Sequence, residues 1–375
     1  MPKEDSKNIF TLADDLKQRS PLVNSLPAAI YVESVSGCPY SCIMCDVKES
    51  KPKLISGELL RKLEPVYPHL YLMGIHGDGE PLLGNDIDYF IETASVNNIV
   101  LHMNSTGFYL TPELTQRLLK CPVLSIRFSL HAARPRTYEK IMRHDLEVVK
   151  RNIAYLVKKS LEIGAKDNEF WLSFIVMKEN LDEIADFLYL AREIGIKQVR
   201  LMRLLPNRFT IRGVYDKKND FIFNHDEQFS RRIKLEFLER LPRIRALAKT
   251  LGISIEGGDM EFECQNIPFF DTALIRKAAD KFLPKRRKGF CLAPWLGGCV
   301  VKQSGQVQLC CNSGLVIGNL FKQDFAEIWN SVIMQNVRKA FCSGYLFRGC
   351  GNCRSVRLEE YPRLVYSEFK DKLSL

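Results

Sequence analysis

The sequence contains no apolar run that approaches the roughly 20 residues of a membrane-spanning helix. Its first 20 residues, MPKEDSKNIFTLADDLKQRS, are charged and lack the apolar core of a secretory signal. Internal repeats, low-complexity tracts and nucleic-acid-binding motifs are also missing. We therefore expect a cytoplasmic globular protein with no membrane partner, and we do not expect nucleic acid to bind.

The composition is that of an ordinary soluble protein with an unusual number of thiols. At 375 residues, 46% hydrophobic and 26% charged, the chain has room for one large domain and a small one. The net charge of +10 is dispersed, apart from the run KFLPKRRKG (281–289), which we interpret as a solvated linker rather than a docking site for an acidic or phosphorylated partner. In a reducing compartment, the 12 cysteines favour metal or catalytic roles over disulfides.

Short apolar runs alternate with helical patterns through the first half of the chain. One helical pattern covers 180–195, with Asn180 as an expected cap, Glu183 three residues later and Gly195 as a stop. The strand-like runs are 29–35, 70–76, 99–104, 123–130, 170–177 and 198–205. Such an alternation predicts a parallel sheet, either curled into an open barrel or doubly wound, with ligands at the carboxyl ends of its strands.

The pattern changes after Pro206. Residues 226–252 predict a long helix interrupted near Pro242, followed by a short strand at 253–258. Seven cysteines between 291 and 353 then indicate a small domain stapled by metal.

The stretch VSGCPYSCIMC (35–45) places Cys38, Cys42 and Cys45 in one loop after the first strand. Three thiolates suit a 4Fe–4S cluster and leave one iron open to a substrate or cofactor. The alternative is a zinc knuckle completed by a distant residue such as His76 or His102.

A second motif, HGDGEPLL (76–83), follows the second strand. Its Glu80–Pro81 pair does not open a helix as a dinucleotide fingerprint requires. Gly79 instead allows an unusual backbone direction that exposes peptide groups to a ligand. With Cys-x3-Cys-x2-Cys after the first strand, this Gly-Glu-Pro resembles the radical S-adenosylmethionine (SAM) superfamily over roughly residues 28–205.

The resemblance implies that SAM chelates the open iron through its amino and carboxylate groups. The positions that match family contacts to SAM are Met44, Asp78, Gly79, Glu80, Pro81, Ser129 and Arg143. Ser129 matches a serine of the fourth strand, whereas Arg143 is a candidate for the SAM carboxylate or else a solvated helix arginine. Met44 stands where the family commonly has an aromatic residue, and His131 where it often has aspartate.

The C-terminal cysteines resemble the SPASM/twitch extension of many radical SAM enzymes. The assigned ligands of one auxiliary 4Fe–4S cluster are Cys291, Cys310, Cys350 and Cys353. Cys311 is the rival to Cys310, Cys299 or Cys342 could enlarge the set, and a structural zinc site is the alternative. The resulting fold class is α/β, a partial (β/α)6 TIM-like barrel with a small iron–sulfur domain. The expected domains are an extension (1–27), the barrel (28–215), a bridge and linker (216–289), the SPASM/twitch domain (290–360) and a tail (361–375).

The implied activity is reductive cleavage of SAM to a 5′-deoxyadenosyl radical, which removes a hydrogen atom from the substrate. An external donor such as flavodoxin or ferredoxin would supply the electron. We expect oxidation or crosslinking of a ribosomally made peptide, with a separate leader-binding protein because few residues precede the barrel. The alternatives are epimerisation with Cys264 as hydrogen donor, a small polar substrate such as an aminocyclitol, or a non-catalytic zinc or iron–sulfur protein.

Overall fold

The computed structural model describes residues 7–45, 47, 51–75, 77–204, 214–216, 221–223, 225–257, 291–311 and 314–343. The six predicted strands of the first half are all present, and neighbouring strands pair in parallel in the order β8-β7-β6-β5-β4-β1. Their bounds are β1 (Ala29–Val32), β4 (Leu72–Ile75), β5 (Val100–Ser105), β6 (Val123–Ser129), β7 (Glu169–Val176) and β8 (Gln198–Arg203). The predicted partial barrel is therefore confirmed.

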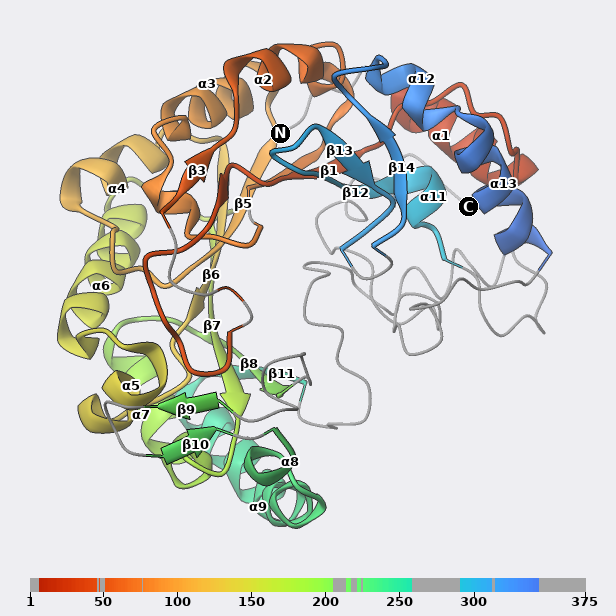
Figure 1. The fold of residues 1–375 in the computed structure, drawn as a ribbon. Coiled ribbons are helices and arrows are strands. Elements are labelled where there is room, and N and C mark those ends of the chain that lie inside the picture. The colour runs from red at the N-terminus through yellow and green to blue at the C-terminus, as the bar shows by residue number, and fades with distance from the viewer. Residues whose placement is uncertain are drawn as a thin grey trace.

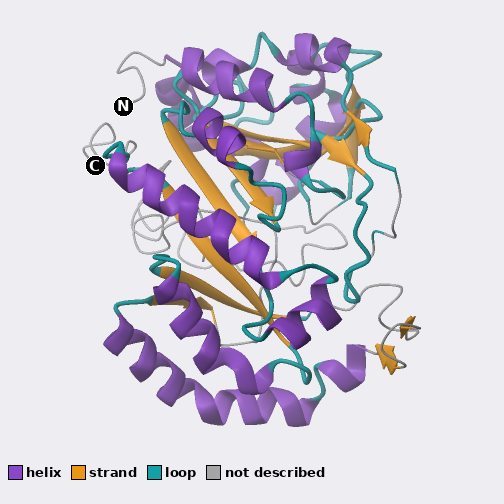
Figure 2. Ribbon diagram, turned by 90° about the vertical axis from the view of Figure 1, so that its left-hand side faces the viewer, coloured by secondary structure: helices purple, strands orange, loops and turns teal. Residues whose placement is uncertain are grey.

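Helices cover the convex outer side of the curved sheet (Figure 1), and Figure 2 shows them in front of the strands. They are α2 (Gly57–Leu63), α3 (Ile87–Asn97), α4 (Pro112–Leu118), α5 (Pro135–Met142), α6 (Leu146–Glu162), α7 (Ile184–Glu193) and α9 (Arg231–Leu251). The short helix α8 (His225–Gln228) precedes α9 and bonds to the segment after β7. Short 3-10 turns, η1 (Tyr67–His69), η2 (Pro81–Leu83) and η3 (Leu181–Glu183), join some of them to the strands. None of the described helices is long and apolar enough to cross a bilayer.

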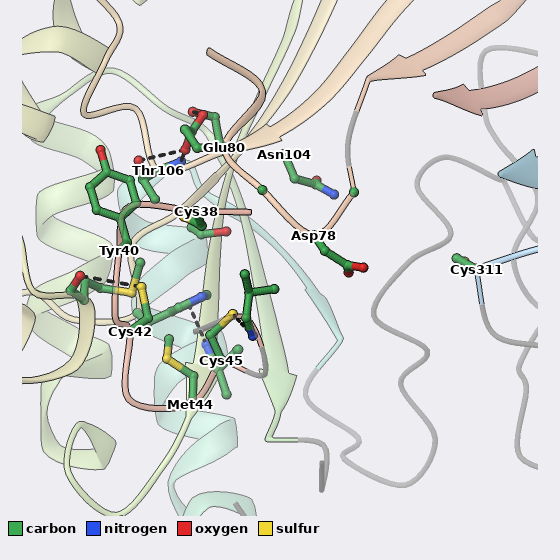
Figure 3. A pocket seen from close by; sticks show the side chains of 18 of the residues that line it. Cys38, Tyr40, Cys42, Met44, Cys45, Asp78, Glu80, Asn104, Thr106 and Cys311 are labelled. Atoms are coloured by element: carbon green, nitrogen blue, oxygen red, sulfur yellow. Dashed lines mark hydrogen bonds between the residues drawn. The ribbon is translucent and has the colours of Figure 1, made fainter. Parts of the chain in front are cut away.

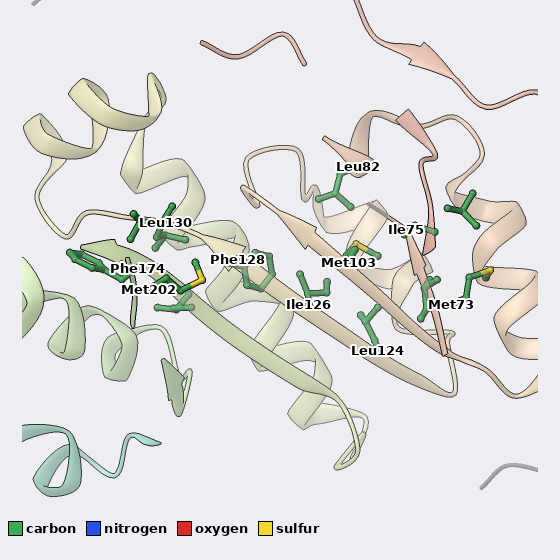
Figure 4. Packing of buried hydrophobic residues seen from close by; sticks show 14 of the residues in the cluster. Met73, Ile75, Leu82, Met103, Leu124, Ile126, Phe128, Leu130, Phe174 and Met202 are labelled. Atoms are coloured by element: carbon green, nitrogen blue, oxygen red, sulfur yellow. The ribbon is translucent and has the colours of Figure 1, made fainter. Parts of the chain in front are cut away.

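The core lies between the strands and the outer helices. On β6, Leu124, Ile126 and Phe128 are fully buried against the helices (Figure 4). Because side chains alternate along a strand, Ser125 and Arg127 point to the barrel interior, where both are buried. The sequence predicted strands that are apolar on both faces. The inner face of the sheet is instead partly polar.

Two local predictions about helices are wrong. Asn180 does not cap the helix that follows; its amide donates to the backbone oxygens of His131 and Ile175, at 2.7 and 2.8 Å, and so holds the exit of β7. Glu183 accepts bonds from the backbone of residues 133 and 134, just before α5. Gly195, by contrast, stops its helix with a φ of 83°, as predicted.

Pro242 does not interrupt the long helix, because α9 is continuous from Arg231 to Leu251. Pro242 lies on the exposed side, where water can bond to the carbonyl group that the missing N–H leaves free. The break comes earlier, where Ser230 caps α9 through the backbone N–H of Ile233. The predicted strand after this helix is β11 (Ser254–Gly257), parallel to β8.

The C-terminal part of the chain extends the sheet, which the sequence did not reveal. β12 (Gly297–Val301) pairs in parallel with β1, β13 (Gln306–Gln308) pairs antiparallel with β12, and β14 (Val316–Asn319) pairs antiparallel with β13. Three helices also belong to this part: α11 (Ala293–Leu296), α12 (Phe325–Trp329) and α13 (Val332–Cys342). Two small antiparallel strand pairs lie outside the main sheet: β2 (Val35–Ser36) with β3 (Lys53–Leu54), and β9 (Val214–Asp216) with β10 (Phe221–Phe223).

The N-terminal helix α1 (Lys7–Gln18) and the segment after it pack on this C-terminal part (Figure 1). Arg338 of α13 is fully buried and donates to the backbone oxygens of Pro21, Pro294 and Trp329, at 2.8–2.9 Å. Burial lowers the pKa of Arg338 to about 10, so the guanidinium keeps its charge at neutral pH.

Candidate functional site

The loop after β2 brings Cys38, Cys42 and Cys45 to one cavity of about 560 Å³ at the carboxyl ends of the strands (Figure 3). The loop rests on the end of α5, where the Cys42 sulfur lies 3.5 Å from the Met142 carbonyl oxygen. The backbone N–H of Ile43 donates to the carbonyl of Ile141 at 3.1 Å. The backbone bond fixes the loop independently of the thiols, whereas the Cys42 thiol gives up its bond to the Met142 carbonyl when it binds metal as a thiolate.

The three thiols suit a polynuclear cluster better than a single ion. An iron–sulfur cluster takes one thiolate on each iron, so three thiols that line one cavity can bind three irons of a 4Fe–4S cluster. Two histidines were considered as a fourth ligand to zinc. His102 is fully buried inside the barrel, with its Nδ1 3.2 Å from the Ser125 hydroxyl. His76 lies outside the described residues. Burial raises the pKa of Cys38 to about 11, so binding of metal as thiolate must release protons.

The second motif lies directly beside the cysteine loop. The backbone N–H of Gly37 donates to the Asp78 carbonyl at 3.1 Å, and Gly37 forms an isolated parallel bridge with Gly79. A Cβ on Gly79 would lie 2.6 Å from the Val35 oxygen and 2.7 Å from the Gly37 oxygen. This close approach of two backbones, rather than a positive φ, is what requires glycine here.

Glu80 fastens the motif to the end of β5. Its carboxylate accepts four bonds: from the Ser105 hydroxyl at 2.7 Å, from the Thr106 hydroxyl and N–H at 2.9 Å each, and from the Leu82 N–H at 3.2 Å. Burial raises the pKa of Glu80, although these bonds oppose the shift. Because its oxygens are already satisfied, Glu80 shapes the loop and leaves the motif backbone to face the cavity.

The other predicted SAM contacts divide into two groups. Met44 and Ser129 line the cavity, whereas Pro81 begins the buried turn η2 and Arg143 ends α5 with a φ of 65°. Neither Pro81 nor Arg143 is among the described residues of the cavity lining. Arg143 is half-buried and its Nη1 is shielded from solvent, so it is not the solvated helix arginine of the alternative, and its contact with SAM stays a prediction.

Asn104, near the end of β5, was not identified from the sequence. It lines the cavity (Figure 3), and within the described part of the chain its buried Oδ1 has no hydrogen-bond partner. An acceptor in that position fits a ligand that brings N–H or O–H groups, as SAM does. The sequence feature that could have identified Asn104 is a polar residue at the end of a predicted strand.

His131 follows β6 and also lines the cavity, in the left-handed backbone region with a φ of 52°. Its Nδ1 accepts from the Ile175 N–H at 3.2 Å, and burial lowers its pKa to about 4. The residue that replaces the family's aspartate is therefore a neutral group that binds β7.

The C-terminal part of the chain contributes to the same cavity. Val300 of β12 and Gln308 of β13 line it, together with Lys302 and Cys311, which follow these two strands. Lys302 is the one lysine or arginine among the described lining residues. Figure 3 shows Cys311 across the cavity from the first three cysteines. Sequence reasoning missed Lys302 because nothing local indicates that β12 pairs with β1.

The second cysteine set is only partly located. Cys291 and Cys299 are buried, and Cys310 is half-buried and close enough to contribute to the raised pKa, about 12, of Cys299. Cys311 lines the cavity and Cys310 does not, so the adjacent thiols face different surroundings. The predicted ligands Cys350 and Cys353 and the predicted hydrogen donor Cys264 lie outside the described residues.

Comparisons with known proteins match both halves of the chain. Residues 32–191 match the family model described as the radical SAM superfamily, and residues 291–354 match SPASM, an iron–sulfur cluster-binding domain. The AdoMet-dependent heme synthase of Methanosarcina barkeri (strain Fusaro / DSM 804) is 24% identical over 92% of this chain and 98% of its own length. The mycofactocin maturase MftC of Mycolicibacterium smegmatis is 20% identical over 48% of this chain and 45% of its own length.

Two solved structures share the architecture. SuiB of Streptococcus suis superposes with a TM-score of 0.58 at 14% identity, over 88% of this chain and 71% of SuiB. Native anSMEcpe with bound AdoMet and Kp18Cys peptide gives a TM-score of 0.58 at 16% identity, over 92% of this chain and 96% of that one. At these identities the likeness establishes a common fold and nothing beyond it.

Proposed function

We propose that this chain, which is a radical SAM superfamily enzyme with a C-terminal SPASM domain, binds SAM in the cavity and modifies a peptide substrate. The observation that carries the proposal is the shared cavity. The three cysteines of the first loop, the Asp78-Gly79-Glu80 motif and the strands of the SPASM domain all open onto it. Cys38, Cys42 and Cys45 are the proposed ligands of the SAM-binding 4Fe–4S cluster.

When bound, the reduced cluster and SAM supply a 5′-deoxyadenosyl radical, and the protein positions and shields it. Backbone carbonyls of the motif, which lines the cavity, would accept hydrogen bonds from the amino group of the methionine moiety. Ser129 and Asn104 offer a hydroxyl and an amide to the polar groups of SAM, and Met44 offers an apolar contact to the adenine. Glu80 holds the motif in place.

Substrate oxidation is the proposed outcome. Cys291, Cys310, Cys350 and Cys353 are the proposed ligands of one auxiliary 4Fe–4S cluster, and a cluster with four protein ligands suits electron transfer. A substrate that loses a hydrogen atom and then an electron to such a centre ends dehydrogenated or crosslinked. An external flavodoxin or ferredoxin is the proposed electron source.

A peptide substrate is supported by related structures. SuiB has been solved with its precursor peptide SuiA, and anSMEcpe with the Kp18Cys peptide. The net charge of +10 would attract an acidic peptide or leader. A leader-binding protein would be a separate partner.

A tetrapyrrole is the second candidate substrate. The heme synthase of M. barkeri aligns over 98% of its own length, which includes both halves of this chain. The carboxylate groups of a tetrapyrrole would also suit a positively charged protein.

The first experiment tests the cofactors. Anaerobically reconstituted protein is expected to be brown, to hold about eight irons if both clusters form, and to release 5′-deoxyadenosine from SAM when reduced. Cys42→Ala should lose about half of the iron and all SAM cleavage. Cys121→Ala, which removes a buried thiol after α4, is the matched control and should keep both. A colourless, zinc-loaded protein that leaves SAM intact would overturn the proposal.

A second experiment compares substrates and outcomes. An acidic peptide pool should raise the formation of 5′-deoxyadenosine above the substrate-free rate, and stimulation by a tetrapyrrole alone would favour the second candidate. Products formed in deuterated water separate oxidation from epimerisation. Solvent deuterium at the reacting carbon that disappears in Cys264→Ala or Cys311→Ala would refute oxidation and identify the hydrogen donor.

A further inference from the structure

The turn between β12 and β13 places a positively charged side chain beside the Asp78-Gly79-Glu80 motif. Lys302 Nζ lies 2.8 Å from Glu33 Oε1 and 3.0 Å from Asp78 Oδ2. Glu33, at the end of β1, is 6% exposed at its side chain, whereas Asp78 is 68% exposed at the cavity. One lysine from the C-terminal part of the chain therefore bridges two carboxylates of the barrel.

The same turn is held by further bonds, which give it one defined position. Glu33 accepts from the backbone N–H of Gln303 at 3.2 Å and from that of Asp78 at 3.3 Å. The Gln303 side chain accepts from the Ser36 hydroxyl at 2.7 Å and donates to the Leu54 carbonyl at 2.8 Å. Both partners flank the cysteine loop, so the turn touches the loop and the motif at once.

Replacing this ion pair with water would lower the stability of the protein. Burial disfavours the charge of Lys302, but bonds to Glu33 and attraction from Asp78 outweigh it and raise the pKa of Lys302. Removing the lysine leaves the buried Glu33 carboxylate without its cation, which is more costly than losing an exposed ion pair. Gly77 also packs against Glu33, because a Cβ on Gly77 would collide with Glu33 Cγ and lie 2.9 Å from its Oε1.

We propose that Lys302 is a positioning residue for SAM. Through Lys302, the geometry of the Asp78-Gly79-Glu80 motif depends on the packing of the SPASM domain against the barrel. Lys302 acts through Glu33 and Asp78 and does not touch the reacting atoms. This inference rests on the proposed function of the cavity. Its consequence is that SAM binds weakly until the C-terminal domain is in place, so the radical is not generated in an incompletely closed barrel.

The test uses the reconstituted holoenzyme. Lys302→Met should raise the dissociation constant of SAM and its KM about tenfold, which corresponds to roughly 1.4 kcal/mol, with kcat changed much less. Lys302→Arg should restore most of the affinity, because a guanidinium can also bridge two carboxylates. Lys322→Met, which removes an exposed lysine of the same domain, is the control and should bind SAM as the wild type does.

A second readout needs neither SAM nor turnover. In urea unfolding, Lys302→Met and Asp78→Asn should each lower the midpoint, and the double variant should lose less than the sum of the two. Asp167→Asn, an exposed control, should be additive with Lys302→Met. Equal SAM affinity in Lys302→Met and wild type, or strict additivity with Asp78→Asn, would overturn the inference. A wild type that cannot cleave SAM would refute the proposed function instead, and would leave the result of this double-variant comparison unchanged.

Discussion

The contact between Gly79 and the strand before the cysteine loop yields a quantitative prediction for Gly79→Ala. The new methyl group would lie 2.6 Å from the Val35 oxygen and 2.7 Å from the Gly37 oxygen. Both are backbone atoms, so relief requires the motif and the cysteine loop to separate by about 0.7 Å, and overpacking of this kind costs about 1–3 kcal/mol. The bond from the Gly37 N–H to the Asp78 carbonyl is lost as well, for about 1 kcal/mol more.

The expected loss of unfolding free energy is therefore about 2–4 kcal/mol, measured by urea denaturation. A displacement approaching 1 Å at the motif should also weaken SAM binding by about 10- to 100-fold, measured by equilibrium dialysis. Gly57→Ala is the matched control. Its Cβ would meet only the Arg61 guanidinium at 3.5 Å, in the first turn of α2, so it should leave both quantities unchanged or stabilise the chain slightly. If Gly79→Ala keeps wild-type stability and affinity, the two backbones are not in contact as described.

Three further predictions concern buried charged or titratable groups. Glu80→Gln turns a carboxylate oxygen into a donor that faces other donors, and should cost about 2–3 kcal/mol in urea unfolding, unlike exposed Glu92→Gln. The pKa of His131 is about 4 when folded, so stability should fall by about 3 kcal/mol between pH 6.5 and pH 4; His131→Gln should show a smaller fall, and an equal fall would exclude His131 as the cause. Arg338→Met should cost about 3–5 kcal/mol and speed cleavage of the N-terminal segment by protease; exposed Arg245→Met should do neither, and a stable Arg338→Met would contradict the role of this guanidinium.

The barrel strands could be predicted from sequence because each is a short, dense apolar run. β5 was predicted at 99–104 and occupies Val100–Ser105. Helix ends were less predictable where a side chain had a more favourable distant partner. Asn180 and Glu183 read as a local cap, yet both bond across to the segment after β6. A helix cap adds only about 1 kcal/mol, which tertiary contacts readily exceed.

The site was predictable to the extent that its chemistry is local in sequence. Cys38, Cys42 and Cys45 lie within eight positions of one another, so their spacing alone brings them to one cavity. Lys302 reaches the same cavity from the far end of the chain, through the pairing of β12 with β1. Strand order is set by tertiary packing and leaves no mark in a local pattern, so such a residue is found only in the three-dimensional structure.

The position of β1 between β4 and β12 has a consequence for how the protein is made. Ala29 pairs with Gly297. During synthesis, the peptide groups on one edge of β1 therefore stay unpaired until most of the polypeptide has left the ribosome. Such an open edge invites pairing with other chains. Truncation before β12 should therefore yield aggregates rather than an isolated barrel. Because β12 pairs with β1 late and across a long sequence separation, the folding rate of the full chain should be low.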